Sequence, residues 1–453
     1  MKNNKTKEQN PRLLALSTLH GAERDGRYIN LAADVSIKGA AMEECDVALF
    51  TTLVYGVTEK KITLDYIISK MASKGGSHIE PRVRNILRMG LYQLIYMDKI
   101  PSHAAVNETV ALCKNRGECS FVNAILRNYI RDGERRVVFP KKEDGIIPYL
   151  SIRYSFPEWI CASLCRDYGE ENAEGILSRF CSSSSSMTIH VNTLKTCMED
   201  VIKKLSEKSI PHHLCAYAPN AIKLPEGAKI TSLCGFDTGE FFVQDEASQI
   251  SAHVLMPKEN SVVIDTCTCP GSKSFAASLY MNNKGKIYSF DLHENKLSLV
   301  LSSAKRLGID IIETAKRDGR MPDTSLFGMA DHVICDVPCS GLGVMAKKPD
   351  IRYKNEEDIL PLAPLGLELL TKSANYLKVG GTLIFSTCTL RRAENEDTVM
   401  SFLKENKNFT LTPFTLKSRS DTEPDIVSDG MLTLLPHIHK TDGFFITKLT
   451  KIS

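Results

Sequence analysis

From about residue 240 onward, short apolar runs alternate with helical patterns, and this alternation restricts the fold more than any other feature of the chain. The runs that read as buried strands are 261–265, 286–291, 332–335, 382–385 and 442–447. Helical patterns lie between them, one after Pro270-Gly271 and another at 293–307. Strands and helices in alternation are typical of a parallel sheet covered by helices. We therefore predict an α/β domain over 240–453.

Two cysteines directly follow two of these strands. Cys339 lies in Asp-Val-Pro-Cys-Ser-Gly (336–341), and Cys388 lies in Phe-Ser-Thr-Cys-Thr (385–389). If the two strands are parallel neighbours, both thiols emerge at one edge of the sheet, where open α/β folds bind ligands. Most buried cysteines are inert, small apolar residues. Two thiols beside a carboxylate, here Asp336, can instead attack a ring covalently and then release it.

Composition limits the class of protein. At 453 residues the chain is too long for one core, and 43% apolar with 25% charged residues is ordinary for a soluble globular protein. No apolar run approaches a membrane span, and the N-terminus leads into no signal-peptide core. We expect a cytoplasmic protein, not bound to membrane, whose fourteen cysteines stay reduced. The cysteine and histidine spacings match no metal-binding module, so we expect no metal site.

The first part of the chain reads as helical and slightly basic. Apolar residues recur at three- and four-residue steps over 81–96, which predicts an amphipathic helix. Further helices are expected at 11–21, 43–57, 61–72, 103–114 and 120–131. Residues 1–140 hold more Lys and Arg than Asp and Glu, although the whole chain has a net charge of only +3. This asymmetry fits an RNA-holding module ahead of a catalytic one, and a solvated helical surface would show the same pattern.

We place a domain boundary in the basic segment 131–142, so that 1–140 forms an all-α domain. Residues 141–239 give mixed signals. They include a helix from Pro157 to about 180, an alternating strand at 187–192 and a helix near 197–207. These signals predict a small α+β subdomain between the helical and α/β domains.

Small residues dominate the segment 265–274, which follows a strand and opens a helix. Small side chains let a ligand approach the backbone, and amides at a helix N-terminus favour a carboxylate. The segment is neither a Walker A loop nor a GxGxxG turn. Asp291 ends the next strand, where it could bind ribose hydroxyls, and Asp318 follows a third, where it could reach an adenine amine. A single such Asp is more often a cap or turn residue. Acidic residues at successive strand ends favour a ligand such as S-adenosylmethionine.

These motifs together resemble the bacterial ribosomal RNA cytosine-5 methyltransferases of the RsmB (Sun/Fmu) family, within the NOL1/NOP2/Sun superfamily. Segment 265–274 is similar to the family's methionine-donor loop, DxCAAPGGKT, 336–341 to its DAPCSG motif and 386–388 to its STC motif. Segments 242–248 and 441–445 resemble two further motifs, the second being the closing TDGFF.

The resemblance extends to the N-terminal part and so covers nearly the whole chain. Residues 11–130 resemble the NusB-type helical RNA-binding domain, particularly at 100–108 and 121–127. The resemblance implies a NusB-like domain over 1–140, a small RNA-binding α+β subdomain over 141–239 and a Rossmann-like class I methyltransferase domain over 240–453. The implied reaction is methyl transfer from S-adenosylmethionine to carbon 5 of a cytosine in small-subunit (16S) rRNA.

Roles for individual residues also follow from the resemblance. Cys388 is implied as the nucleophile that adds to carbon 6 of cytosine, and Cys339 as the residue that assists release. Asp336 would contact the N3 edge of the base, with Lys273 in support. The target base must leave its stack to reach them. The residues implied in donor binding are Cys267, Thr268, Cys269, Pro270, Gly271, Ser272, Lys273, Asp291, Asp318 and Asp336.

Some residues depart from the family's motifs. Ser272 stands where the family usually has Gly, Thr268-Cys269 where it has Ala-Ala, and Ser274 where it has Thr. His190 replaces the Arg of an RVN motif, which removes a fixed positive charge near the expected RNA path.

Several alternatives stay open. DNA cytosine methyltransferases use the cysteine of a Pro-Cys motif as nucleophile, which here is Cys339. The same chemistry could act on transfer RNA or large-subunit rRNA. A third possibility is a NusB-like RNA-binding assembly factor without catalysis. In each case we expect RNA as the macromolecular partner and a monomeric protein.

Overall fold

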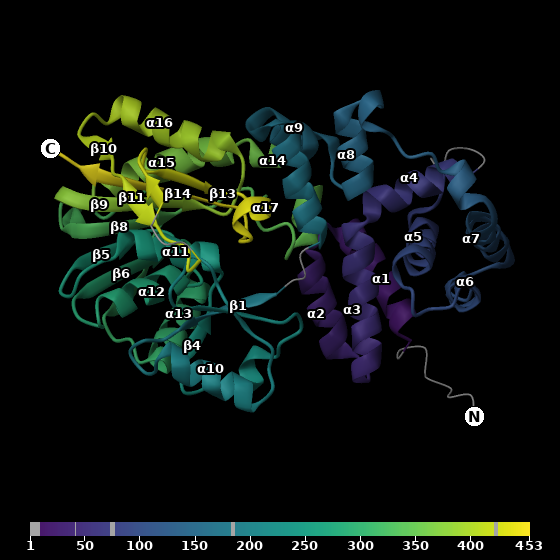
Figure 1. Cartoon of the computed structure of the whole chain (residues 1–453), viewed down its shortest axis with the longest axis horizontal. Coiled ribbons are helices and arrows are strands. Elements are labelled where there is room, and N and C mark those ends of the chain that lie inside the picture. The colour runs from purple at the N-terminus through teal and green to yellow at the C-terminus, as the bar shows by residue number, and fades with distance from the viewer. Residues whose placement is uncertain (1–9, 41, 73–77, 183–185, 421–424) are drawn as a thin grey trace. The chain divides into compact units, whose positions relative to one another are not determined.

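The computed structural model describes residues 10–40, 42–72, 78–182, 186–420 and 425–453. The chain divides into two compact units (Figure 1). The first unit comprises residues Met1–Cys181 and Lys348–Lys354, and the second comprises Ser182–Lys347 and Asn355–Ser453. The predicted domain boundaries near 140 and 240 stay predictions.

Helices build the described part of the first unit. They are α1 (Pro11–Asp25), α2 (Ile29–Gly39), α3 (Glu44–Glu59), α4 (Lys61–Met71), α5 (Pro81–Tyr96), α6 (Ser102–Val110), α7 (Arg116–Arg136), α8 (Ile146–Tyr154) and α9 (Glu158–Ser182), with short 3-10 helices η2 (Lys142–Asp144) and η5 (Pro349–Tyr353). Six predicted helices are confirmed, and the majority of their ends lie within a few residues of the predicted ends. They are the helices predicted at 11–21, 43–57, 61–72, 81–96, 103–114 and 120–131. Helix α2 was not predicted, and α9 is interrupted at Gly169, where φ is 80°.

Local signals explain where several helices begin and end. Asn10 caps α1 by accepting the backbone N–H of Arg12 at 2.9 Å, and Gly26 ends the helix with φ 62°. Glu80 caps α5 in the same way, ahead of Pro81 in the first turn. The apolar stripe of α5, which includes Ile86 and Leu87, is fully buried in the core of the unit.

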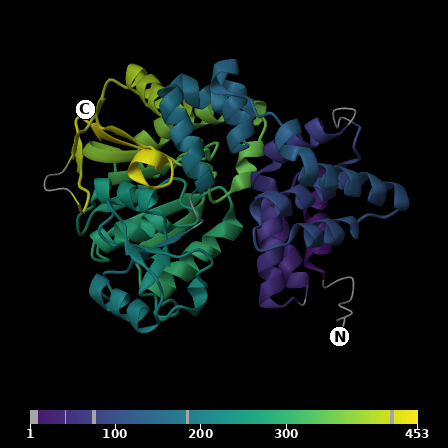
Figure 2. The same cartoon turned by 45° about the vertical axis from the view of Figure 1, so that its right-hand side comes forward.

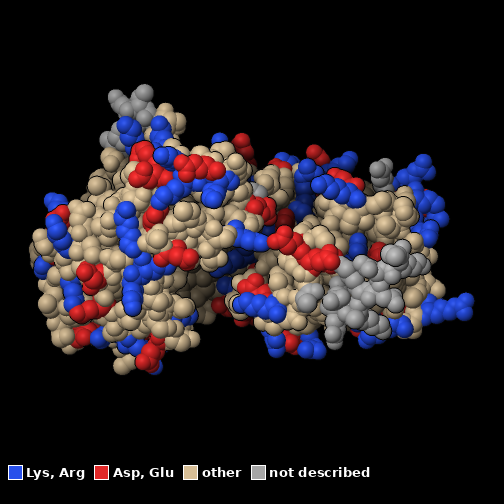
Figure 3. All heavy atoms as spheres, turned by 90° about the horizontal axis from the view of Figure 1, so that it is seen from below, with Lys and Arg blue, Asp and Glu red and all other residues tan. Residues whose placement is uncertain are grey.

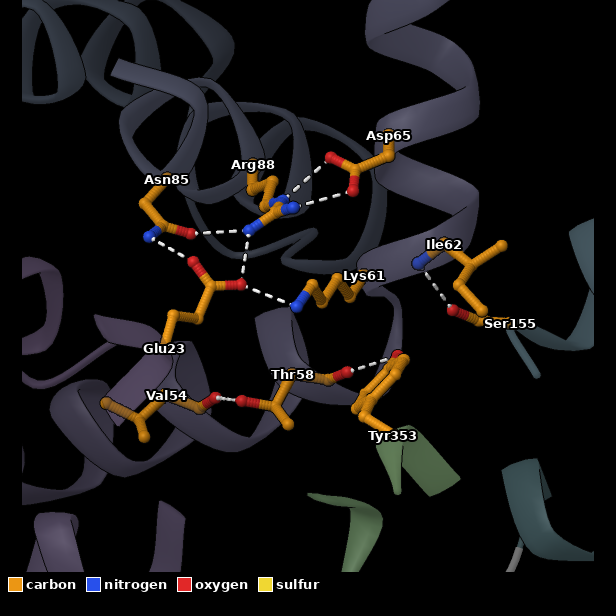
Figure 4. A network of polar contacts seen from close by, with 10 residues as sticks. All are labelled: Glu23, Val54, Thr58, Lys61, Ile62, Asp65, Asn85, Arg88, Ser155 and Tyr353. Carbon is orange, nitrogen blue, oxygen red and sulfur yellow. Dashed lines mark hydrogen bonds and ion pairs between the residues drawn. The ribbon is translucent and has the colours of Figure 1, made fainter. Parts of the chain in front are cut away.

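The segment Lys348–Lys354 lies far along the chain from the rest of its unit. The Arg352 side chain is fully buried, and its guanidinium lies 4.0 Å from the centre of the Phe156 ring. Its Nη1 donates to the Glu59 carbonyl at 3.1 Å. The Tyr353 hydroxyl donates to the carbonyl of Thr58 at 2.8 Å (Figure 4). The chain therefore leaves the second unit after Lys347, completes the first and returns.

The second unit begins with a four-stranded antiparallel sheet of order β2-β3-β1-β4. Its strands are β1 (Met187–Val191), β2 (His213–Leu214), β3 (Ala221–Leu224) and β4 (Phe241–Val243). Helix α10 (Met198–Glu207) contributes Val201 and Leu205 to the same small core as Ile189 and Ile222. This confirms the strand and the helix predicted in the middle of the chain.

An eight-stranded mixed sheet forms the centre of the second unit, with the order β10-β14-β9-β8-β5-β6-β7 and β13 paired to β14. Strands β9, β8, β5, β6 and β7 are parallel, and β14 is antiparallel to β9. The strands are β5 (Val262–Asp265), β6 (Lys286–Asp291), β7 (Ile312–Lys316), β8 (Ala330–Asp336), β9 (Leu377–Thr387), β10 (Phe409–Leu411), β13 (Met431–Leu434) and β14 (Phe444–Lys451). A separate pair joins β11 (Phe414–Leu416) to β12 (Asp425–Val427).

Both faces of this sheet are buried, which explains the continuous apolar runs. Along β5, Val263 packs into one core and Ile264 into the other. Helices α11, α12 and α13 cover the first face, and α15 and α16 cover the second (Figures 1 and 2). The helices of this unit are α11 (Glu246–Leu255), α12 (Ser272–Tyr280), α13 (Glu294–Leu307), α14 (Glu356–Ile359), α15 (Leu362–Ala374), α16 (Glu396–Glu405) and α17 (Pro436–His439), with η3 (Ile230–Ser232), η4 (Thr324–Leu326) and η6 (Arg392–Glu394). The predicted α/β fold is confirmed.

The chain order of the parallel strands reverses between β5 and β8. From β5 the sheet continues through β6 and β7 on one side and through β8 and β9 on the other. Strand β5 pairs with β8 so that Asp265 lies opposite Ile334, and both strands end at the same edge. Open α/β sheets bind ligands at this kind of switch point, outside the carboxyl ends of the strands.

Two further features concern the charge of the surface and the length and hydropathy of the helices. On the face drawn in Figure 3, Lys and Arg side chains are interspersed with Asp and Glu side chains. Among the residues described, no helix is both long and apolar enough to pass through a bilayer.

Candidate active site

Cys339 and Cys388 meet at the carboxyl edge of the sheet. Strands β8 and β9 are parallel neighbours, with Asp336 opposite Ser386, so the loops that follow them emerge side by side. The two Sγ atoms lie 3.3 Å apart, and both residues are half-buried. The prediction that both thiols share one edge is confirmed.

Polar contacts beside the sulfurs join the two loops. Each cysteine is followed by a hydroxyl residue, and the Ser340 and Thr389 hydroxyls form a hydrogen bond of 2.6 Å. The Ser340 backbone N–H donates to the buried Glu394 carboxylate at 2.8 Å. The Gly343 N–H donates to the Cys388 carbonyl at 2.9 Å. The distance between the sulfurs is therefore fixed by contacts of their neighbours.

Asp336 ends β8 next to the thiols and is held from two directions. Its Oδ2 accepts from Lys273 Nζ at 2.6 Å, and its Oδ1 accepts from the Ser386 hydroxyl at 2.6 Å. The Lys273 ammonium also lies 5.3 Å from the centre of the Phe444 ring. The Lys273 side chain is 10% exposed and that of Asp336 is 30% exposed. This leaves a fixed, accessible carboxylate beside two sulfurs.

The surroundings keep Cys339 protonated. The pKa of its thiol is raised well above the usual value, first by the hydrogen bond with Cys388, then by burial and by the negative charges of Cys388, Glu394 and Asp336. A protonated Cys339 can donate its S–H to the Cys388 sulfur. Either sulfur of this pair could be the donor, so the contact supports a thiolate at one of the two cysteines.

The loop after β5 lies at the same edge, on the other side of the switch point. Asp265 is 1% exposed, accepts from the Ser274 hydroxyl at 2.6 Å and has its pKa raised to about 6, chiefly by burial. Gly271 has φ 101°, and a Cβ there would lie 2.7 Å from the Phe275 ring. Only glycine fits this position without strain. Thr268 and Gly271 are buried, Cys267, Cys269 and Ser272 are half-buried, and Pro270 is exposed.

Asp291 and Asp318 follow the next two strands of the sheet. Asp291 accepts the backbone N–H of His293 at 2.9 Å and that of Cys269 at 3.3 Å, so it lies against the loop after β5. Asp318 lies beyond β7 and is bound by Arg320, whose Nη2 donates to it at 2.6 Å. The structure thus brings Asp291 to the loop, whereas Asp318 is held by an arginine that the sequence analysis did not consider.

Comparisons with known proteins agree over almost the whole chain. Residues 252–450 match the family 16S rRNA methyltransferase RsmB/F, 9–131 match the NusB family, and 156–231 match the RsmF/B-like ferredoxin-like domain. The probable ribosomal RNA small subunit methyltransferase B of Bacillus subtilis is 36% identical over 98% of this chain and 99% of its own length. That of Synechocystis is 34% identical over 97% and 99%.

The chain belongs to the RsmB/F family of 16S rRNA methyltransferases. A structural comparison agrees, because the crystal structure of PH0851 is 26% identical and has a TM-score of 0.77 over 97% of this chain and 99% of its own. The predicted family and the predicted fold are therefore confirmed, with NusB-like helices, a ferredoxin-like subdomain and a methyltransferase sheet.

The RsmB/F motifs did not reveal every residue of the site. Glu394 binds the Cys339 loop, yet it lies beyond the motif that contains Cys388. Ser386 belongs to that motif, but its contact with Asp336 depends on the register of β8 and β9. The Ser340–Thr389 contact had a signal in the sequence, since a hydroxyl residue follows each cysteine.

His190 lies in the core of the small antiparallel sheet. The ring is 2% exposed and stacks on Phe242 with 4.9 Å between ring centres. Its Nδ1 forms a 2.8 Å hydrogen bond with Gln244, and burial lowers its pKa to about 4. His190 is thus a neutral core residue, which agrees with the expected loss of a fixed positive charge at this position, while the position of the RNA path stays a prediction.

Proposed function

We propose that this RsmB/F protein methylates carbon 5 of a cytosine in 16S rRNA, with S-adenosylmethionine as donor and Cys388 as covalent nucleophile. The sulfur pair carries this proposal. Two thiols 3.3 Å apart, next to a carboxylate held by a lysine, have the groups that covalent attack on a pyrimidine requires.

Carbon 5 of cytosine is too weak a nucleophile to take a methyl group unaided. Addition of the Cys388 thiolate forms an Sγ–C6 bond and pushes electron density onto carbon 5. Carbon 5 then takes the methyl group as the sulfonium–methyl bond of the donor breaks and S-adenosylhomocysteine leaves. Carbon 5 next passes its proton to a water molecule, and the electron pair of that C–H bond expels the Cys388 sulfur. Cys339, 3.3 Å from Cys388, is proposed to assist this release by donating its S–H to the departing sulfur.

Asp336 is proposed to contact the N3 edge of the base. Negative charge grows on the ring as sulfur adds to carbon 6, and a proton shared at N3 relieves it. Lys273 Nζ, 2.6 Å from Asp336, can supply such a proton through the carboxyl group. Ser386 holds the other carboxylate oxygen and so fixes the orientation of the group.

The loop after β5 fits S-adenosylmethionine, which when bound supplies the methyl group. The loop around Gly271 has no space for a side chain at this position, and α12 begins directly after Gly271. The Asp291 carboxylate has lone pairs beyond those used by two backbone N–H groups, and it could take the ribose hydroxyls. We propose these residues with 267–273 as the donor site, and Asp318 as the contact of the adenine amine.

Substitution of each cysteine tests the proposal. We expect Cys388→Ala to abolish 5-methylcytosine, read by bisulfite sequencing of 16S rRNA. Cys339→Ala should accumulate a covalent protein–RNA complex that survives denaturing electrophoresis. The opposite pattern would make Cys339 the nucleophile, as in DNA cytosine methyltransferases.

RNA is the partner that we propose for the helical first unit, by its likeness to the NusB family. Bisulfite sequencing of transfer RNA and 23S rRNA from a deletion strain separates the substrate alternatives. Calorimetric titration with S-adenosylmethionine tests catalysis against a pure assembly role, because an assembly factor without catalysis needs no donor site.

A further inference from the structure

One lysine of the second unit holds two carboxylates from distant parts of the chain. The Lys347 ammonium lies 2.8 Å from Asp442 Oδ2 and also contacts Asp245 Oδ2. Asp245 caps α11 by accepting the Ala247 N–H at 3.1 Å. Asp442 lies two residues before β14. The side chains are 30%, 23% and 12% exposed for Lys347, Asp245 and Asp442. The ammonium therefore joins three separate segments.

Those segments are also in backbone contact at Gly343. Its carbonyl accepts the Gly443 N–H at 2.9 Å, and its own N–H donates to the Cys388 carbonyl at 2.9 Å. A Cβ on Gly343 would lie 1.8 Å from the Gly443 oxygen. The loop that runs from Cys339 to Lys347 is thus pressed between the backbone of Cys388 and that of Gly443.

Both ends of this loop are fixed. At the first end, Ser340 binds Thr389 and Glu394. At the second end, only four residues beyond Gly343, Lys347 binds the residue that precedes Gly443. The ion contact and the Gly343–Gly443 hydrogen bond therefore link the same two segments twice.

We propose that Lys347 is a positioning residue for the reaction, which holds the Cys339 loop against Cys388 and so sets the separation of the two sulfurs. It contacts no reacting atom and acts through the loop. The proposal rests on the proposed function of the cysteine pair, and it adds a residue outside the motifs that carry the catalytic roles.

The charges explain why the ammonium is needed. Burial and the charge of Asp245 raise the pKa of Asp442 to about 7, which reflects two carboxylates that share one cation. Burial opposes the charge on Lys347, but the two carboxylates outweigh it, and the pKa of Lys347 is raised. Without the cation the Lys347 side chain no longer ties its loop to Asp245 and Asp442, and the two carboxyl groups can relax only by separating or by sharing a proton.

The rate at which the two thiols form a disulfide tests their separation, and this measurement requires neither RNA nor donor. Diamide takes two electrons and two protons from the Cys339 and Cys388 thiols, is reduced to the hydrazine and leaves a disulfide, which peptide mass spectrometry detects. We expect Lys347→Met to form this disulfide about 10-fold more slowly than the wild type, because misplacement by about 1 Å has a large effect on such encounters. Lys347→Arg should restore the rate.

A matched control is Lys378, whose ion pair with Asp331 lies on the same sheet and is 46% and 35% exposed. Lys378→Met should leave the disulfide rate unchanged. In methylation assays, Lys347→Met should lower kcat about 10-fold with the KM for RNA within about 2-fold, and Lys347→Arg should recover most of kcat.

Several outcomes overturn the proposal. A folded Lys347→Met protein that forms the disulfide at the wild-type rate contradicts it, as does a raised KM for RNA with unchanged kcat, which would make Lys347 an RNA contact. If Lys347→Met does not fold, Asp442→Asn provides the test, and an unchanged disulfide rate there also overturns it. A wild-type protein that forms the disulfide rapidly but makes no 5-methylcytosine would refute the proposed function alone.

Discussion

Each unit contains an ion network around one basic side chain, and the two networks differ in how completely their charges are paired. In the helical unit, Arg88 is 5% exposed and donates to both oxygens of Asp65, at 2.7 and 2.6 Å. It also donates to Glu23 and to Asn85, each at 2.8 Å (Figure 4). Lys61 binds the same Glu23 oxygen at 2.6 Å. Arg88 itself lies in the interior, whereas the carboxylates of Glu23 and Asp65 are 32% and 28% exposed.

The pair at the sheet edge has fewer contacts and lies beside two thiols. Lys273 holds Asp336 with one contact, and the carboxylate keeps 30% of its surface exposed beside two thiols. A fully paired network stabilises the fold. Removal of one charged side chain leaves its partners with unpaired charges, which the weakly polar protein environment solvates poorly. A carboxylate held by one lysine and one hydroxyl has lone pairs left for a substrate. We infer that the first network serves stability and the second serves chemistry.

The largest effect is expected for a substitution of Asp336, which should change activity far more than stability. We expect Asp336→Asn to lower kcat by roughly 10²- to 10⁴-fold, because the amide cannot pass a proton to the base. The melting temperature should move by no more than about 4 °C. Asp331→Asn, at the far end of β8, is the control and should keep full activity. Loss of stability equal to the loss of activity would contradict the comparison.

Arg88 should show the reverse behaviour. Arg88→Met leaves Glu23 and Asp65 without their main partner, and we expect the free energy of unfolding to fall by about 3 kcal/mol. Urea denaturation followed by circular dichroism measures it. Donor binding by the folded fraction should be unchanged. Arg24→Met removes an exposed ion pair with Asp25 in the same unit and should leave stability nearly unaffected.

Glu23 makes the stability of the helical unit depend on pH. Arg88 and Lys61 lower the pKa of Glu23 from 4.5 to about 2 against the opposing effect of burial. A lowered pKa stabilises the fold above pH 4.5, and this contribution is lost as pH falls from 4.5 toward 2. After allowance for solvent it amounts to about 1–2 kcal/mol. The stability difference between wild type and Glu23→Gln should shrink over that interval, and a constant difference would contradict the assignment.

The smallest effect concerns Tyr353. Its hydroxyl donates to the Thr58 carbonyl, and Tyr353→Phe should lower the free energy of unfolding by about 1 kcal/mol. Thermal unfolding of the two proteins at one pH suffices to measure the change. A stability equal to that of the wild type would mean that this hydrogen bond contributes nothing beyond what water provides.

Sequence patterns predicted the elements that bury a regular apolar stripe. Helix α5 and the strands of the central sheet were found because their periodicity follows directly from burial on one face or on both. Helix α2 was missed because it buries only Ile29 and Ala33, while Leu31 and Val35 are 57% and 72% exposed. Its apolar pattern therefore does not mark a buried face.

For the candidate site, too, the sequence predicted only part of what the structure contains. Motifs could bring Cys339, Cys388, Asp336 and Lys273 to one edge, since each follows a strand or opens a helix at that edge. Contacts between separate loops were not predictable. Lys347 binds Asp442, 95 residues further along the chain, only because the folded sheet brings their segments together.

Segment Lys348–Lys354 has a consequence for how the protein is made. Helices α1–α9 emerge first from the ribosome, but the carbonyl of Thr58 and the ring of Phe156 obtain Tyr353 and Arg352 only after residue 354 has been synthesised. The helical unit is thus completed during translation of the catalytic half, and not before it. A nascent chain stopped ahead of residue 348 should hold these helices in a less protected state than the full chain does.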